Sequence, residues 1–364
     1  MHFGLTEERA LLQETLRRVA STELPPQRLR DSFDSGTGFD KAFWHSAAGI
    51  GLQGLIVPEE YGGAALEMLD LALAFEVLGE AAAPGPFLGH ALTSLALSRS
   101  NDADLKAKWL PGLASGELIG GCALADGSDT WAATDWTLAD ASGRLTGVKR
   151  YAEAGPQTDL ILVGLRGGVL GLVDARGGGV RITPIAGHDR SRCLADIHFE
   201  GAAVSRLGDG SANGEDGLGN DIVDAGSILL AADAFGAAWK LIRASVDYAQ
   251  TREQFATPIA QFQAVKHQLA NMAMEAEPMR GLIWHAAYAF DHQRELASQE
   301  ASTAKAHVTD RAVQIGRDAV SIHGGIGFTW ECDVHFHLKR AMHDRGWLGA
   351  PAAHRARLAD LAGW

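Results

Sequence analysis

Two apolar stripes in residues 224–279 constrain the fold of this chain more than any other feature. Apolar side chains recur there at alternating steps of four and three residues, and the pattern returns after a break that contains Pro258. The stripes consist of Ile228, Ala232, Phe235, Trp239, Ile242, Val246 and Ala249, and then of Phe262, Val265, Leu269, Met272, Ala276 and Met279. This spacing places apolar side chains on one face of an α-helix. We therefore expect two long helices, joined by roughly ten residues, that fold back as an antiparallel pair.

The connector between these helices is long and polar for a helical hairpin. It reads TREQFATPIAQFQ over residues 251–263, with Arg252 and Gln263 near its two ends. Loop length by itself only hints at function, so spacing leaves two interpretations open, a solvated connector and a binding loop.

The expected secondary structure changes twice along the rest of the chain, from helix to strand and back to helix. Residues 1–116 read as mostly helical, with Thr6 as an N-cap and Pro25 and Pro26 at the end of the first helix. Short β-like runs, separated by clusters of Gly, Asp and Ser, fill the middle of the chain. The runs cover residues 136–138, 145–148, 160–163, 169–173, 180–183 and 197–199.

Beyond residue 208 the chain reads as helical again. A third long helix is expected over about residues 302–322, before Gly324 and Gly325. This order predicts a mostly helical α+β fold in three domains. These are an N-terminal helical domain (1–116), a small antiparallel β-domain (117–208) and a C-terminal four-helix bundle (209–364).

The charge composition limits the kinds of partner that this chain can bind. The 32 Lys and Arg residues stand against 45 Asp and Glu, a formal charge of −13, which excludes nucleic acid or an anionic membrane as the main partner. Three scattered cysteines, an acidic N-terminus and the absence of a long apolar run predict a cytoplasmic protein. The C-terminal histidines lack metal-ligand spacing, so no metal site is expected.

Three stretches carry a family resemblance. TREQFATPIAQFQAVKHQLANM (251–272), VPEEYGG (57–63) and HGGIGFTWECDVHFHLKRA (323–341) resemble motifs of the acyl-CoA dehydrogenase family. The resemblance implies an oxidoreductase and flavoprotein of lipid metabolism, with FAD as cofactor, an acyl-CoA thioester as substrate and an electron-transfer acceptor.

The resemblance also assigns cofactor-binding residues. It implies that Arg252 reaches across a subunit interface to the FAD pyrophosphate, and an arginine suits this role because its planar guanidinium donates paired bonds and keeps its charge. It implies that Phe255, Ile259 and Gln263 line the same nucleotide pocket. The turn formed by Gly324, Gly325 and Gly327 is implied to meet the adenosine-phosphate portion of a neighbouring subunit's FAD.

The chain departs from the family where it would serve its own flavin. Ala125 stands where the family has a threonine in the flavin loop of residues 123–129, and Ala152 and Glu153 replace an Ile-Thr pair. Both family positions of the catalytic glutamate hold glycine, at residues 226 and 349.

Asp233 is a weak candidate for a relocated base. It lies seven residues beyond the glycine at position 226, on the same helical face. A polar helical stripe shared with Lys240 and Asp247 is the alternative role.

Groups that the family donates to a neighbour are therefore kept, and groups that serve the chain's own site are altered. The pattern resembles one subunit of the heteromeric dehydrogenases of bacterial steroid and bile-acid side-chain degradation. The hypothesis is a partner subunit without its own base, in an α2β2 heterotetramer with a homologous subunit. Two alternatives stay open: a self-sufficient homotetramer that uses Asp233, and a non-enzymatic binding or scaffold subunit without FAD.

Overall fold

The computed structural model describes residues 4–127, 130–208 and 217–364 of the chain. Within them the chain divides into two compact units. One unit consists of Met1–Pro26, Ala72–Ala83 and Ser227–Trp364, and the other of Gln27–Leu71 and Pro84–Gly226. We call them the helical unit and the sheet unit. The domain boundaries at residues 116 and 208 stay a prediction.

Long helices make up the helical unit. They are α1 (Glu7–Glu23), the end of α4 (Met68–Glu80), most of α7 (Leu218–Thr251), α8 (Gln263–His292), α9 (Arg294–His323), α10 (Val334–Gly346) and α11 (Pro351–Leu361). Thr6 caps α1 as expected, because its hydroxyl accepts a hydrogen bond from the backbone amide of Arg9 at 3.3 Å.

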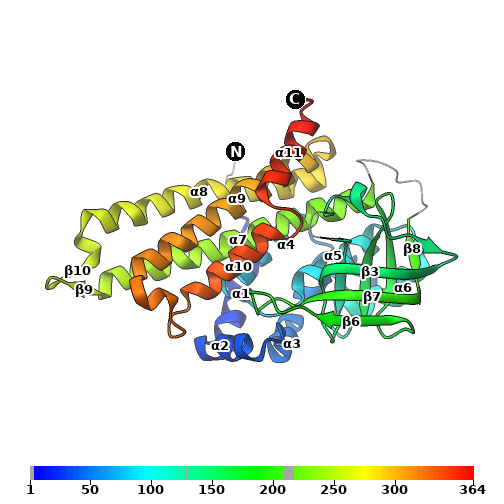
Figure 1. Ribbon diagram of the computed structural model, residues 1–364, viewed down its shortest axis with the longest axis horizontal. Helices are drawn as coiled ribbons and strands as arrows, with labels where there is room; N and C mark the ends of the chain where they lie inside the picture. The colour runs from blue at the N-terminus through cyan, green and yellow to red at the C-terminus, as the bar shows by residue number, and fades with distance from the viewer. Residues whose placement is uncertain (1–3, 128–129, 209–216) are drawn as a thin grey trace. The chain divides into compact units, whose positions relative to one another are not determined.

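The two apolar stripes correspond to α7 and α8, which run antiparallel (Figure 1). The third expected helix is α9, which packs against α8 and α10. The most apolar window of α7 is long enough to cross a membrane, but 94% of that window is buried inside the protein, as in the core helix of a globular domain. The helix pair expected from the sequence is therefore confirmed.

Two glycines let α4 and α7 approach closely. A Cβ atom on Gly79 of α4 would lie 1.9 Å from the carbonyl oxygen of Asp233, and one on Gly236 of α7 would lie 1.9 Å from that of Glu76. Both contacts are with backbone atoms, which cannot rotate away. The crossing of α4 and α7 therefore depends on the absence of side chains at these two positions.

The sheet unit combines short helices with strands. Its helices are α2 (Pro26–Ser35), α3 (Lys41–Gly49), α5 (Phe87–Arg99) and α6 (Ala103–Ala114). Its strands are β1 (Gly120–Ala123), β2 (Asp140–Ala141), β3 (Arg144–Glu153), β4 (Leu160–Leu165), β5 (Val169–Asp174), β6 (Val180–Pro184), β7 (Leu194–Ala203) and β8 (Ser205–Leu207).

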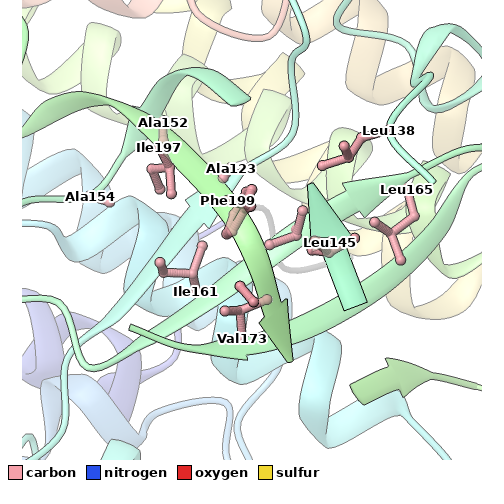
Figure 2. Packing of buried hydrophobic residues seen from close by; sticks show 12 residues of the cluster. Ala123, Leu138, Leu145, Ala152, Ala154, Ile161, Leu165, Val173, Ile197 and Phe199 are labelled. Atoms are coloured by element: carbon pink, nitrogen blue, oxygen red, sulfur yellow. The ribbon is translucent and has the colours of Figure 1, made fainter. Parts of the chain in front are cut away.

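The strands form one sheet in the order β6-β7-β3-β1-β4-β5-β8, with β2 paired to β3. The pairs are antiparallel except β1 and β4, which run parallel. Alternate side chains of β3, β4 and β7, such as Leu145, Ile161 and Phe199, pack into a common core (Figure 2). The expected β-domain is confirmed, with a mixed sheet where an antiparallel one was predicted.

One predicted strand is wrong, and three strands of the sheet, β1, β2 and β8, were missed. Residues 136–138 are extended but join no ladder, because Trp136 is buried against the sheet at Gly164, where an added Cβ would lie 2.7 Å from the indole ring. The missed strand β1 contains Gly120 and Gly121, and glycine has a low propensity for strands.

Candidate cofactor-binding site

The connector after α7 is a small closed hairpin. The backbone amide of Arg252 donates to the carbonyl oxygen of Tyr248 at 2.8 Å, and the amide of Ile259 donates to the carbonyl oxygen of Arg252 at 2.8 Å. Between them β9 (Glu253–Gln254) pairs with β10 (Thr257–Pro258). The main chain of Arg252 is thus held from both sides while its side chain is exposed.

The tip of this hairpin stores backbone strain. Phe255 and Ala256 both adopt left-handed conformations, with φ of 53° and 60°. Such a turn normally uses Asn and Gly, because a side chain crowds the backbone at positive φ. The Phe255 side chain is 92% exposed and meets Phe262 edge-on at 6.2 Å. Strain and an exposed aromatic ring at one tip are typical of a binding loop.

The other two predicted residues of this motif follow the hairpin. Ile259 begins a single turn of 3-10 helix (Ile259–Gln261) and is half-buried. Gln263 is the first residue of α8 and is exposed. Its backbone amide belongs to the unsatisfied first turn of a helix, where the partial positive charge favours anions.

The glycine turn lies at the end of α9. Gly324 has φ of 63°, and a Cβ on Gly324 or Gly325 would have no atom within 4 Å. Gly327 instead packs inward, where a Cβ would meet the carbonyl oxygen of Val320 at 2.9 Å. The backbone of the first two glycines is therefore open to a ligand, and the adjacent Phe328 ring is 80% exposed.

The structure brings the connector and the glycine turn together. The Tyr248 ring, four residues before Arg252, stacks on the His323 ring at 4.4 Å, and its hydroxyl donates to the His323 carbonyl oxygen at 3.3 Å. Burial lowers the pKa of His323, which favours the neutral ring. A cavity of about 300 Å³ lies beside this contact, lined by Tyr248, His323 and Ile326 among others.

This end of the helical unit suits a nucleotide. It presents an exposed guanidinium on a fixed main chain, an exposed aromatic tip, a helix N-terminus and an open glycine backbone. A pyrophosphate needs permanent positive charge and N–H donors, and an adenosine needs flat apolar surface and close backbone approach. The residues predicted for the FAD nucleotide therefore fit that group chemically.

The flavin loop of the sheet unit is satisfied internally. The backbone amides of Asp126 and Gly127 both donate to the Thr130 hydroxyl at 2.8 Å. The Asp126 carboxylate binds the Lys149 ammonium at 2.7 Å and accepts from the backbone amide of Thr137 at 2.6 Å. Burial lowers the pKa of Lys149 to about 8, and its pairing with Asp126 opposes that shift. Ser128 and Asp129 of the predicted loop lie outside the described residues.

The strand positions that differ from the family are buried as well. Ala152 belongs to the sheet core (Figure 2), and Glu153 is fully buried opposite Cys122 of β1. Burial raises the pKa of the Cys122 thiol, and the nearby Glu153 raises it further. Glu153 thus lies inside the unit.

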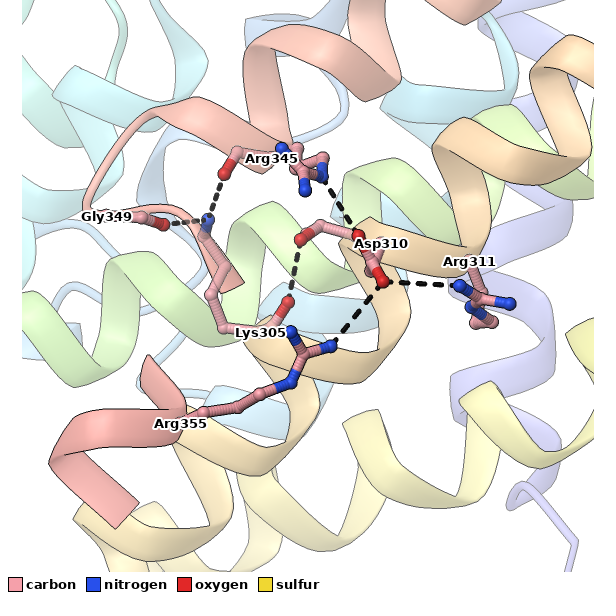
Figure 3. Close-up of polar contacts among 7 residues, drawn as sticks. Lys305, Asp310, Arg311, Arg345, Gly349 and Arg355 are labelled. Atoms are coloured by element: carbon pink, nitrogen blue, oxygen red, sulfur yellow. Dashed lines mark hydrogen bonds and ion pairs between the residues drawn. The ribbon is translucent and has the colours of Figure 1, made fainter. Parts of the chain in front are cut away.

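Gly349, at one family position of the base, has a backbone that disfavours any other residue. Its φ is 99°, and the preceding Leu348 has φ of 58°. The carbonyl oxygen of Gly349 accepts from the Lys305 ammonium at 3.0 Å, and that of Arg345 accepts from it at 3.3 Å (Figure 3). Lys305 is completely buried, and desolvation lowers its pKa to about 7. Position 226, the other family position, is a buried glycine within α7.

Asp233 is part of the helical core. It is fully buried 3.4 Å from Nε of Arg340, which is equally buried and donates to the carbonyl oxygen of Ala83 at 2.5 Å. The expected polar stripe with Lys240 and Asp247 is wrong, because those two side chains are exposed and Asp233 is not. The ion pair favours a structural role for Asp233.

The sequence pattern does not mark Lys149, Lys305 and Arg340 as buried charges. Lys149 and Arg340 each stand beside another basic residue, Arg150 and Lys339, and these pairs read as ordinary surface charge.

Comparison with known proteins identifies the class. Residues 6–117 match the N-terminal domain of acyl-CoA dehydrogenase and residues 221–362 match its C-terminal domain. The chain belongs to the acyl-CoA dehydrogenase family. The members of this family are flavoproteins, oxidoreductases that act on CH–CH bonds with FAD in lipid metabolism.

Individual relatives and solved structures show which members of the family this chain is similar to. The chain is 30% identical over 354 residues to the acyl-CoA dehydrogenase IpdE2 of Mycobacterium tuberculosis, with 97% of this chain and 96% of that protein covered. A solved steroid acyl-CoA dehydrogenase, the Tcur3481-Tcur3483 G363A variant, superposes with a TM-score of 0.89 at 28% identity over 98% of both chains. The ChsE4-ChsE5 complex of Mycobacterium tuberculosis, at 23% identity over 100% of this chain and 99% of the matched chain, shares the fold with a TM-score of 0.89.

Proposed function

We propose that this chain is the partner subunit of an FAD-dependent acyl-CoA dehydrogenase. In this role Arg252, Phe255, Ile259 and Gln263 and the glycine turn complete the FAD nucleotide site of a homologous subunit. Bound FAD supplies the hydride acceptor for the β-carbon of the acyl group. The homologous subunit supplies the carboxylate that removes the α-proton, and the assembly is an α2β2 heterotetramer.

The observation that carries this proposal is the backbone at Gly349. A base at this position would need a side chain at φ of 99°, where side chains rarely fit. The carbonyl oxygen is also committed to Lys305. The positive φ and the Lys305 bond both disfavour a side chain that acts as a base at this position, which supports the proposal.

The contrast between the two halves of the chain supports the same role. Most of the residues proposed to serve a neighbour's cofactor are exposed, namely Arg252, Phe255, Gln263, Gly324 and Gly325. The amides of Asp126 and Gly127 in the flavin loop are instead bonded to Thr130 within the sheet unit. The burial of Asp233 beside Arg340 counts against the self-sufficient alternative.

The relatives suggest the substrate class. One similar solved protein is described as a steroid acyl-CoA dehydrogenase, and the descriptions of two solved neighbours name two components, Tcur3481-Tcur3483 and ChsE4-ChsE5. We infer a bulky, steroid-type acyl-CoA for the assembly of this chain, with an electron-transfer protein as acceptor.

The proposal is tested by changing Arg252 to Ala in the co-expressed complex. Loss of a charge-assisted contact to pyrophosphate should weaken FAD binding by about tenfold to a hundredfold. FAD retained after gel filtration, measured by its absorbance, should fall with it. Arg181→Ala is the matched control, because Arg181 is exposed on β6 and bonds within its own strand to Thr183 at 3.0 Å.

Unchanged flavin content and activity in the Arg252→Ala complex would favour the scaffold alternative. Assembly of the variant complex, checked by its elution volume, separates loss of FAD from loss of the complex.

A further inference from the structure

A second cavity of about 300 Å³ lies in the helical unit among α1, α4, α7 and α8. It shares no lining residue with the cavity beside the glycine turn. Its charged lining consists of Arg17, Arg243 and Arg280 with Glu76 and Glu80. Three arginines against two glutamates leave one positive charge in excess, in a chain whose overall charge is −13.

The two carboxylates are already bonded within the protein. Glu80 accepts from Arg17 at 3.0 Å and forms a second ion pair with Arg243. Glu76 is 5% exposed and accepts from the Gln13 amide and the Trp284 indole, each at 3.0 Å. These contacts involve Arg17 and Arg243, and Arg280 is the third arginine of the cavity.

Among the residues that the structure describes, the Arg280 guanidinium lies against aromatic rings and makes no hydrogen bond. Its guanidinium carbon lies 5.3 Å from the ring centre of Phe235, 5.6 Å from that of Trp239 and 6.0 Å from that of Trp284. Within the described parts of the chain its ion-pair partner is Glu277, at 3.6 Å, which is longer than a hydrogen bond. A guanidinium carries five N–H donors in a planar fork, so Arg280 has donors to offer a ligand.

We propose that this cavity binds a small aromatic carboxylate. The carboxylate pairs with the Arg280 fork, a geometry that suits two parallel N–H···O bonds. The ring of the ligand lies against the aromatic wall of Trp239 and Trp284. The excess of positive charge matches an anion, and the volume is at the small end of ligand sites.

The test uses the purified full-length chain and 4-fluorobenzoate, observed by fluorine NMR. Saturable line broadening that unlabelled benzoate reverses is the expected result. The neutral isostere 4-fluorobenzamide should bind about tenfold more weakly or worse, because it cannot form the charged pair. Arg280→Gln should weaken the binding of 4-fluorobenzoate by about tenfold or more. Arg280→Lys keeps the charge without the planar fork, so its affinity should lie between those of the wild type and Arg280→Gln.

Arg317→Gln is the matched control, since Arg317 is exposed on α9 and does not line the cavity, and it should bind as the wild type does. Thermal unfolding of each variant checks that it is folded. No saturable binding, equal affinity for benzoate and benzamide, or an Arg280→Gln variant that binds as the wild type does would each overturn the proposal. None of these outcomes bears on the FAD content of the complex, so this test is independent of the proposed function.

Discussion

Individual buried charges decide much of this chain's chemistry. Lys305 is completely buried, and its side-chain nitrogen donates hydrogen bonds to the carbonyl oxygens of Arg345 and Gly349. These bonds hold the segment between α10 and α11 in place. Nearby Asp310 accepts from Arg345 at 3.1 Å and from Arg311 at 3.2 Å (Figure 3). Burial opposes ionisation of Asp310, but these bonds outweigh it and lower its pKa.

Lys305 makes stability depend on pH. Its pKa is lowered from 10.5 to about 7 by burial, so the folded state favours the neutral amine while the unfolded chain still binds the proton. This contribution to the free energy of unfolding is fully present above pH 10.5 and is lost as the pH falls through about 7. Denaturant unfolding of the wild type between pH 7 and pH 9.5 should therefore show stability that rises with pH from this group.

Lys305→Met should remove this dependence and leave two carbonyl oxygens without their donor, at a cost of about 1–3 kcal/mol. Lys266→Met, at an exposed position on α8, should keep the wild-type pH profile. A Lys305→Met variant with the wild-type pH slope would contradict the assignment.

At the scale of elements, helix packing rests on small residues. The contact between α4 and α7 places Gly79 and Gly236 against the backbone of the opposite helix, 1.9 Å from a carbonyl oxygen if a Cβ is added. No rotamer change can relieve such a clash, so the helices would have to separate. The neighbouring buried groups Asp233 and Glu76 would move with them.

Gly236→Ala should lower the free energy of unfolding by about 1–3 kcal/mol, the usual cost of overpacking. Gly281→Ala is the control on α8, where an added Cβ meets nothing within 4 Å. There alanine should raise stability by about 0.5–1 kcal/mol, because it is the better helix former. Urea unfolding of both variants measures the contrast, and equal effects would refute the packing argument.

At the scale of the whole molecule, the proposed role is that of half a cofactor site. The helical unit carries the residues proposed to bind the nucleotide, and the amides of Asp126 and Gly127 in the chain's own flavin loop are bonded internally. Neither feature alone implies a hetero-oligomer, but together they favour unequal subunits.

The chain purified alone should therefore contain little FAD, and the complex with its homologous subunit should contain about one FAD for two chains, a ratio that follows from one altered site in each pair. Absorbance of released flavin against protein concentration gives the ratio. One FAD for each chain in the isolated protein, with turnover of an acyl-CoA, would refute the partner-subunit role.

The sequence by itself determined the elements whose signals are local. The apolar stripes gave α7, α8 and α9, and alternation bounded by turns gave β3 to β7, because periodic burial is written in neighbouring residues. It missed β1, whose glycines hide the strand pattern, and it misread residues 136–138, where burial of Trp136 takes the place of strand pairing.

For the candidate site too, the sequence predicts some residues, and only the tertiary structure decides their contacts. Motif residues such as Arg252 and Gly324 could be named in advance, because their spacing in the chain is characteristic. The contact between their two segments, in which Tyr248 stacks on His323, was decided by the tertiary structure. So were the burial of Asp233 with Arg340 and of Lys305 beneath Gly349, because desolvation depends on neighbours far away in the sequence.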